Sequence, residues 1–180
     1  MKKIFFALTL LLAACTPDYN QKPQLQDYTK SPFYELPVNR VVIESARSSK
    51  DEGMHVENTM PISVEKFLKN WATVHLHPNY QTENKARLII RKADMTRKDA
   101  PMAGLFVYDN YKYTLAYHVS IIVEHDQGKK TFDVEGFLSQ TLPQKATKEQ
   151  RDNMFMYMLN DLDAELNKQV SAQIKENFLD

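Results

Sequence analysis

The alternation of apolar and polar residues predicts four strands and two helices. Alternation with a period of two indicates a half-buried strand, and repetition every 3.6 residues indicates an amphipathic helix. By these criteria we expect strands at residues 40–48, 85–95, 111–125 and 131–142. The helices are expected at residues 64–77, capped by Ser63, and from Thr147 to about residue 178. The order of elements is therefore β-α-β-β-β-α.

The clearest strand and the last helix carry the strongest patterns. Along residues 111–125 the apolar positions all fall on one face, and a turn at Asp126-Gln127-Gly128 leads into the next strand. Thr147 and Gln150 have the spacing of a capping box, in which each side chain bonds the other residue's backbone amide. The helix that follows would be about 45 Å long, against about 40 Å for a twelve-residue strand. We therefore expect the helix to overhang its sheet.

This order of elements predicts a two-layer α+β sandwich. Helices that bury one apolar stripe can cover one face of a mainly antiparallel sheet. We expect a four-stranded sheet with both helices on the same face, in a single domain at residues 38–180. The first strand–helix–strand connection leaves two alternatives open, a parallel pairing or a pairing with a more distant strand.

The first fourteen residues have the composition of a secretory signal peptide. Met1-Lys2-Lys3 is basic, and residues 4–14 are almost entirely apolar and end in small residues. The apolar run is too short for a bilayer-spanning helix, which needs roughly 20 residues. An ordinary secretory signal that happens to contain a cysteine, or a buried strand, is the alternative interpretation.

Leu12-Ala13-Ala14-Cys15 resembles the bacterial lipobox, Leu-(Ala/Ser)-(Gly/Ala)-Cys, at all four positions. The resemblance implies cleavage before Cys15 and attachment of fatty acyl chains, such as palmitate, to its sulfur and amino group. Two or three chains hold a protein stably on a membrane, whereas one holds it only marginally. Thr16 in place of Asp implies the outer membrane under enterobacteria-like sorting rules. Because those rules differ between bacterial groups, the inner membrane remains the alternative.

Residues 15–37 are expected to be a flexible tether after the lipidated cysteine. Four prolines are interleaved with Asp, Asn and Gln, a composition that buries little apolar surface. Twenty-two such residues span roughly 25 Å r.m.s. and about 75 Å when extended. The tether would let the domain stand away from the bilayer.

Charge and cysteine content exclude several classes of function. The 23 basic and 23 acidic residues become 21 and 23 once Lys2 and Lys3 are removed, which leaves a net charge of −2. Such a chain has no basic surface for nucleic acid. Cys15 is the only cysteine, so the mature domain forms no internal disulfide.

The sequence contains no pattern that predicts an enzyme, a cofactor or a metal site. His75 and His77 are two residues apart, and such positions point to different sides of a helix. His118 is expected on the polar face of its strand. Asp161, Asp163 and Glu165 are interpreted as a solvated face of the last helix. Hydrolase motifs and a glycine-rich phosphate loop are missing from the sequence.

One connection between strands is unusually apolar. Connections usually run over the protein surface, yet residues 100–108 contain Met102, Leu105, Phe106, Val107 and Tyr108. If exposed, these side chains form a contact patch for a membrane, a lipid or a protein partner. Alternatively they extend the flanking strands and join the core.

Beyond the lipobox, the chain resembles a family of small exported lipoproteins of alphaproteobacteria. The residues that carry this resemblance are Val56-Glu57-Asn58, Pro61-Ile62-Ser63, Trp71-Ala72, residues 88–93 and residues 158–166. The element order also resembles the lipopolysaccharide-assembly lipoprotein and the auxiliary lipoproteins of lipid-transporting ABC systems. Neither resemblance supplies catalytic or binding residues, and architecture alone does not determine function.

The resemblances imply a periplasm-facing, non-enzymatic accessory or assembly module of the cell envelope. Its partners would be the membrane, through the acyl chains on Cys15, and an envelope protein or a lipid. The alternative is a carrier or auxiliary subunit of lipid transport, with an apolar ligand held between the sheet and the helices.

Overall fold

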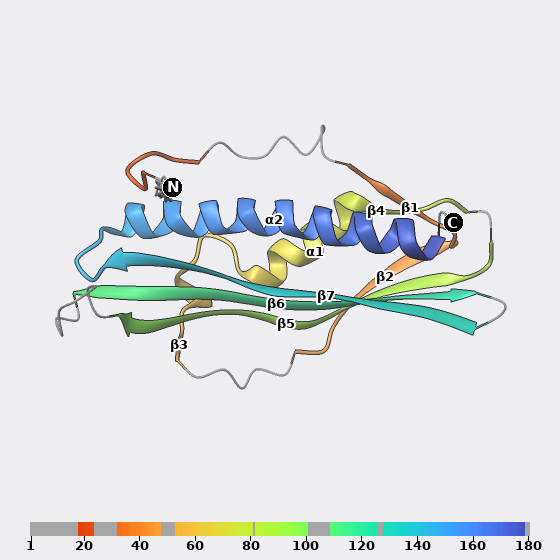
Figure 1. Cartoon of the computed structure of the whole chain (residues 1–180), viewed down its shortest axis with the longest axis horizontal. Coiled ribbons are helices and arrows are strands. Elements are labelled where there is room, and N and C mark those ends of the chain that lie inside the picture. The colour runs from red at the N-terminus through yellow and green to blue at the C-terminus, as the bar shows by residue number, and fades with distance from the viewer. Residues whose placement is uncertain are drawn as a thin grey trace, which may run out of the picture.

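The computed structural model describes residues 18–23, 32–47, 53–80, 82–100, 109–125 and 128–178. These residues form a twisted sheet with both α-helices on one face, which confirms the α+β sandwich (Figure 1). The strands are β1 Tyr34–Leu36, β2 Arg40–Ser45, β3 Met54–His55, β4 Leu76–Pro78, β5 Lys85–Ala100, β6 Asn110–His125 and β7 Gly128–Pro143. The helices are the 3-10 turn η2 Glu57–Thr59, α1 Val64–His75 and α2 Lys148–Phe178.

The main sheet has the order β2-β5-β6-β7, with the short β3 also paired to β5. The pairs β5–β6 and β6–β7 are antiparallel, as the hairpin pattern predicts. The strand β2 runs parallel to β5, with Val42 opposite Arg87, and this resolves the alternative that the sequence left open. The sheet therefore has five strands where the sequence predicted four, because the two residues of β3 are too few to show a period.

A second, two-stranded sheet lies at residues that the sequence assigned to other structures. The strands β1 and β4 are parallel, with Tyr34 opposite Leu76. The sequence predicts a tether over residues 34–36, but Leu36 is fully buried and belongs to the core. The predicted tether thus extends too far toward the C-terminus. The sequence predicts that the first helix includes residues 76–77, whereas it ends at His75.

Both α-helices begin at the predicted caps. The Ser63 hydroxyl accepts a hydrogen bond from the Lys66 amide at 3.3 Å. At α2 both halves of the capping box form: Gln150 N–H donates to Thr147 Oγ1 at 3.2 Å, and Thr147 N–H donates to Gln150 Oε1 at 2.9 Å. The apolar stripes of both helices pack on β5, β6 and β7 in one hydrophobic core, whose largest fully buried side chains include Tyr117, Phe155, Leu88, Met95, Leu115 and Met158.

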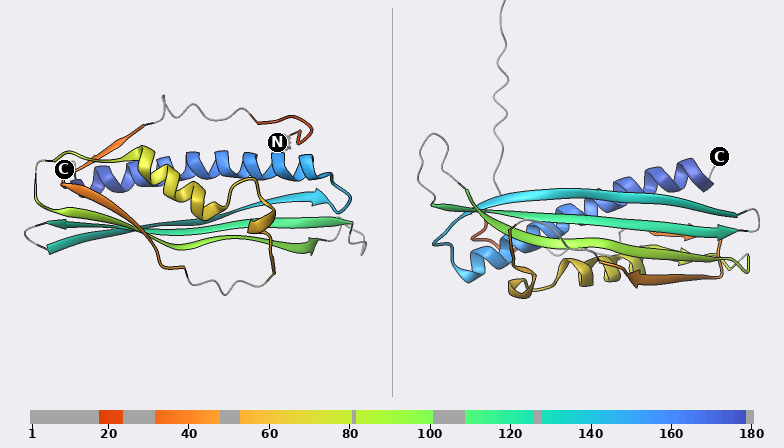
Figure 2. Two further views of the ribbon diagram at one scale, coloured as in Figure 1. Left: turned by 180° about the vertical axis from the view of Figure 1, so that it is seen from behind. Right: turned by 90° about the horizontal axis from the view of Figure 1, so that it is seen from below.

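The last helix does not overhang the sheet along the strands, which corrects that expectation. The strands β5, β6 and β7 have 16 residues each, about 53 Å, and the 31 residues of α2 span about 46 Å. The expected overhang is wrong because the alternating pattern predicts strands shorter than the 16 residues that each of them has. Instead α2 crosses the sheet obliquely, and its C-terminal end passes beyond the edge at β7 (Figure 2, right).

Candidate functional site

The functional residues that the sequence predicts fall outside the described residues. This holds for Cys15 and for the apolar residues Met102, Leu105, Phe106, Val107 and Tyr108. Their described neighbours are Asp18 on one side and Ala100 and Asp109 on the other. These neighbours lie at the same end of the molecule, where β5 ends, β6 begins, β7 ends and α2 begins (Figure 1). That end is fastened by Asn110 opposite Pro143 and by a Gln144 N–H bond to the Asp109 carbonyl at 2.8 Å.

Residues 18–23, the described segment nearest Cys15, are bound to the domain. The Tyr19 hydroxyl donates to Gln140 Oε1 on β7 at 2.8 Å, and its ring packs edge-on against Tyr157 with centroids 5.8 Å apart. The buried Asn153 side chain donates to the Tyr19 carbonyl at 3.0 Å. Burial raises the pKa of the Tyr19 hydroxyl, and the charge of Asp161 and the neighbouring Tyr157 add to this. The hydroxyl is therefore a neutral donor at physiological pH.

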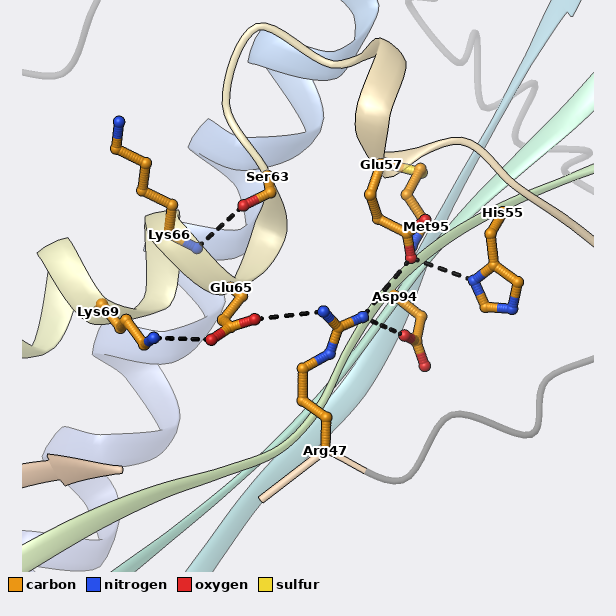
Figure 3. A network of polar contacts seen from close by, with 9 residues as sticks. All are labelled: Arg47, His55, Glu57, Ser63, Glu65, Lys66, Lys69, Asp94 and Met95. Atoms are coloured by element: carbon orange, nitrogen blue, oxygen red, sulfur yellow. Dashed lines mark hydrogen bonds and ion pairs between the residues drawn. The ribbon is translucent and has the colours of Figure 1, made fainter. Parts of the chain in front are cut away.

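A cluster of charged side chains gathers around Arg47, beyond the end of β2 (Figure 3). Arg47 Nη2 donates to Asp94 Oδ1 on β5 at 2.8 Å and lies 3.8 Å from Glu57 Oε1. Arg47 Nη1 donates to Glu65 Oε2 on α1 at 3.2 Å. Glu57 also accepts the Met95 amide at 3.0 Å and His55 Nδ1 at 3.2 Å. One guanidinium therefore joins β2 to η2, α1 and β5.

The pKa shifts in this cluster fit an ion-pair network. Burial alone would raise the pKa of Glu57, but hydrogen bonds from the Met95 amide and from His55 outweigh it, and the pKa is lowered. Likewise burial would lower the pKa of Arg47, whereas the bonds to Asp94 and Glu65 raise it. For Glu65 the bond from Lys69 is the largest cause of a lowered pKa. Arg47, Glu57 and Glu65 are therefore charged at neutral pH.

Three members of the cluster have the donor types of a metal site. Ligand atoms of His55, Glu57 and Asp94 all lie within 4.8 Å of one another. However, the Arg47 guanidinium already stands beside both carboxylates and supplies the positive charge that a cation would bring. The arrangement therefore acts as a bridge between segments, and a metal ion would have to displace Arg47.

A second polar pair lies inside the core between α1 and α2. His75 Nε2 is 3.6 Å from Asp163 Oδ1, and both side chains are at most 1% exposed. His75 Nδ1 donates to the Pro32 carbonyl at 2.5 Å, and the Trp71 ring stacks on the imidazole at 5.0 Å. The solvated carboxylate face predicted for α2 is therefore wrong at Asp163, whose other oxygen accepts from Asn167 at 2.8 Å.

The other histidines that the sequence singled out lie apart from this pair. His77 is exposed and donates to the Val74 carbonyl at 2.9 Å, so it does not join His75 in a shared site. His118 lies on the sheet face away from the helices and bonds Asp133 across the strand pair at 3.0 Å, as its predicted position implies. The Ser120 bond is the largest cause of the lowered pKa of Asp133, followed by the His118 bond.

Two open clefts flank α1. One, of about 340 Å³, lies between α1, β2 and β4 and includes Val41, Ile43 and Leu76 in its lining. The other, of about 360 Å³, is lined by Ile62, Phe67, Asn70, Thr73 and Val74. Both are on the surface beside the helix, whereas the space between helices and sheet is filled by core side chains.

Within the described residues, no helix is both long and apolar enough to cross a membrane. No protein-family model matches the chain, and no curated protein matches it. Among solved structures, the rare lipoprotein B of Shewanella oneidensis is similar at 12% identity and a TM-score of 0.42, over 79% of this chain and 100% of that one. A minor lipoprotein of Acinetobacter baumannii is similar at 15% identity and a TM-score of 0.40, over 75% and 92%. These values describe a distant likeness in the path of the chain.

Proposed function

We propose that this chain is an exported lipoprotein, acylated on Cys15, whose domain works as a non-enzymatic accessory or assembly module at the outer membrane, facing the periplasm. The observation that carries the proposal is the lipobox at residues 12–15, which is followed, after only Thr16 and Pro17, by a segment bound to a folded domain. An acyl anchor joined in this way to a folded module delivers that module to a membrane surface.

The polar clusters support a binding role over catalysis. The Arg47 cluster joins four segments of the fold, and the His75–Asp163 pair lies where α1 meets α2. In both clusters the described carboxylates and imidazoles each lie within 3.8 Å of an oppositely charged or polar side chain. These contacts explain the two clusters as links that hold segments of the domain together.

The contact with a partner is assigned to residues 102–108. These apolar residues connect β5 to β6, and both strands continue to the residues that flank the connection. Apolar side chains of this kind, if exposed, suit contact with an envelope protein or a lipid.

The anchoring is tested by Cys15→Ala. Metabolic labelling with an alkyne fatty acid and membrane fractionation should show that the variant loses the label and leaves the membrane pellet. Its circular dichroism should match that of the unaltered domain, because residue 15 precedes the described fold. If the variant stays labelled and sediments with membranes, the assignment of Cys15 is wrong.

The partner contact is tested by photo-crosslinking in intact cells. A photoreactive residue at Phe106 should capture an envelope component, whereas one at the exposed Lys129, at the far end of β7, should not. Leu105→Ser with Phe106→Ser should abolish capture and leave the melting temperature unchanged. A large fall in melting temperature would place these residues in the core instead.

A carrier of lipid is the alternative function, favoured by the apolar lining of the cleft at Ile62, Phe67 and Val74. It predicts that protein extracted under native conditions carries a lipid visible in mass spectrometry. Substituting Val74→Asp in that cleft should release this lipid. Protein that is free of lipid in both forms excludes the carrier function.

A further inference from the structure

The N-terminal segment touches α2 at two separated places. Near the start of the helix, Asn153 and Gln150 bond the Tyr19 carbonyl and the Asn20 side chain, each at 3.0 Å. Farther along, the Tyr34 hydroxyl donates to the Asn167 carbonyl at 2.9 Å. These helix positions are 14 residues apart, about 21 Å along the axis. The segment is thus fastened near the start of α2 as well as at β1.

The first attachment is preformed by a turn. Asn20 N–H and its side-chain amide both bond Asp18 Oδ1, at 3.0 and 2.7 Å, and Gln21 N–H bonds the Asp18 carbonyl at 3.1 Å. This turn presents the Tyr19 carbonyl and ring to α2. Its partner Asn153 is 4% exposed, so loss of the bond would leave a buried amide without its acceptor.

The attachment sets how far the domain can be from the lipid. Only Thr16 and Pro17 separate Cys15 from Asp18, and the three steps between these Cα atoms reach at most about 10 Å. If residues 18–23 were detached, the free chain would run from Cys15 to Phe33, about 25 Å r.m.s. and up to about 60 Å. A docked segment therefore removes most of the freedom that a tether of this length would have.

From this geometry we infer that one end of the domain lies against the lipid bilayer. This anchor end comprises residues 18–23, 109–112 and 140–150. The inference rests on the proposed acylation of Cys15 and adds an orientation to it: α2 and the three long strands extend away from the membrane, and the end where β6 finishes and β7 starts is distal.

Charge at the anchor end is nearly balanced. Its exposed basic side chains are Lys22, Lys112, Lys145 and Lys148, and its exposed acidic side chains are Asp18, Asp109 and Glu149. Neither sign dominates, so the acyl chains and the docked segment hold this end in place, and headgroup charge contributes little. The orientation should therefore be the same in zwitterionic and anionic vesicles and at high salt.

Energy transfer from a single fluorophore to the bilayer measures the orientation. The acylated full-length protein is reconstituted into phosphatidylcholine vesicles that carry an acceptor on the lipid headgroup. Because Cys15 is the only native cysteine and is acylated, Lys145→Cys or Lys129→Cys supplies the one free thiol for the donor dye. Residue 129 is about 46 Å along β7 from Pro143, and residue 145 lies two residues beyond the end of that strand. We expect transfer from residue 145 to exceed transfer from residue 129 at least about threefold.

Two variants detach the domain from its anchor without removing the anchor. Tyr19→Ala removes the ring contact and the bond to Gln140. Ten Gly/Ser residues inserted between Thr16 and Pro17 lengthen the link outside the described fold. With either change, the energy-transfer efficiencies from residues 145 and 129 should become nearly equal, while the protein stays with the vesicles. Gln169→Ala is the matched control, since it removes a bond to Tyr117 from the other half of α2 and should preserve the difference.

Each result supports or overturns the orientation. Equal transfer from residues 145 and 129 in the unaltered protein would overturn it, and so would a difference that survives the insertion. Weak transfer from residue 145 combined with crosslinking of that position to a protein in cells would show that a protein covers this end. Failure to float with vesicles at all would instead refute the acylation of Cys15.

Discussion

His75 on α1 and Asp163 on α2 face each other in the interior, with Nε2 3.6 Å from Oδ1. The imidazole also bonds the carbonyl of Pro32, two residues before β1 begins, and so three parts of the chain meet at this ring. Removing water from two such groups is costly, and only their mutual attraction and remaining hydrogen bonds offset that cost. The pair therefore specifies how α1, α2 and the N-terminal strand fit together.

Asp163→Ala should destabilise the domain by about 3 kcal/mol, because it leaves the buried His75 facing an apolar side chain. Asp161→Ala, two residues earlier and exposed, should change the free energy of unfolding by less than about 0.5 kcal/mol. Urea denaturation followed by circular dichroism measures both. Equal losses of stability in the two variants would mean that the contact between His75 and Asp163 does not stabilise the fold.

Thr147→Ala should cost about 1 kcal/mol, because it removes the side-chain acceptor of the Gln150 amide at the start of α2. Thr141→Ala on the exposed face of β7 is the matched control and should be nearly neutral. Thermal unfolding compares the two. A neutral Thr147→Ala would show that Gln150, through its own bond to the Thr147 amide, caps the helix alone.

Glu57→Gln should make the free energy of unfolding fall less steeply as the pH becomes acidic. The pKa of Glu57 is lower in the folded protein than its ordinary value of 4.5, so the unfolded carboxylate binds a proton more readily. Its stabilisation is complete above that value and is lost as the pH falls through the folded pKa. The difference in urea midpoint between the unaltered protein and Glu57→Gln should therefore shrink from pH 7 to pH 3. Parallel profiles would contradict the ion-pair role of Glu57.

Gly136→Ala should destabilise the sheet by about 1–3 kcal/mol. A Cβ at this position would lie 2.8 Å from the hydroxyl of the buried Tyr117 on the neighbouring strand. Tyr117→Phe removes that oxygen, so the double variant should lose less stability than the sum of the two single changes. Strict additivity in a double-mutant cycle would mean that the clash lies elsewhere.

Most of the fold can be predicted from the hydrophobic periodicity of the sequence and from its helix-capping residues. The long strands and both α-helices have strong patterns, and Ser63 and Thr147 mark the starts of the helices correctly. The sequence could not reveal β1, β3 or β4, because strands of two or three residues contain at most one and a half periods. Their existence depends on partners far away in the chain, such as Leu76 for Tyr34.

The polar contacts were less predictable than the fold. Asp163 lies four residues after Leu159 and three before Leu166, on the apolar stripe of α2, and this position was a signal that the carboxylate is buried. His75 likewise follows Trp71 by four residues. Tyr19 stands as a large aromatic residue in a polar stretch, but its partner Asn153 is 134 positions away. No local pattern connects residues at that separation.

The strand β7 ends the sheet order, and its outer edge has no partner among the described strands. An open row of amides and carbonyls invites pairing with another chain, and charged side chains along an edge oppose this. The first half of β7 has such charges, at Lys129, Lys130, Asp133 and Glu135. Residues 136–143 carry no charge, and the side chain of Phe137 among them is 73% exposed. The second half is where Tyr19 reaches Gln140. Of the two halves of β7, the second is therefore the more open to pairing with another chain, and it lies beside residues 18–23.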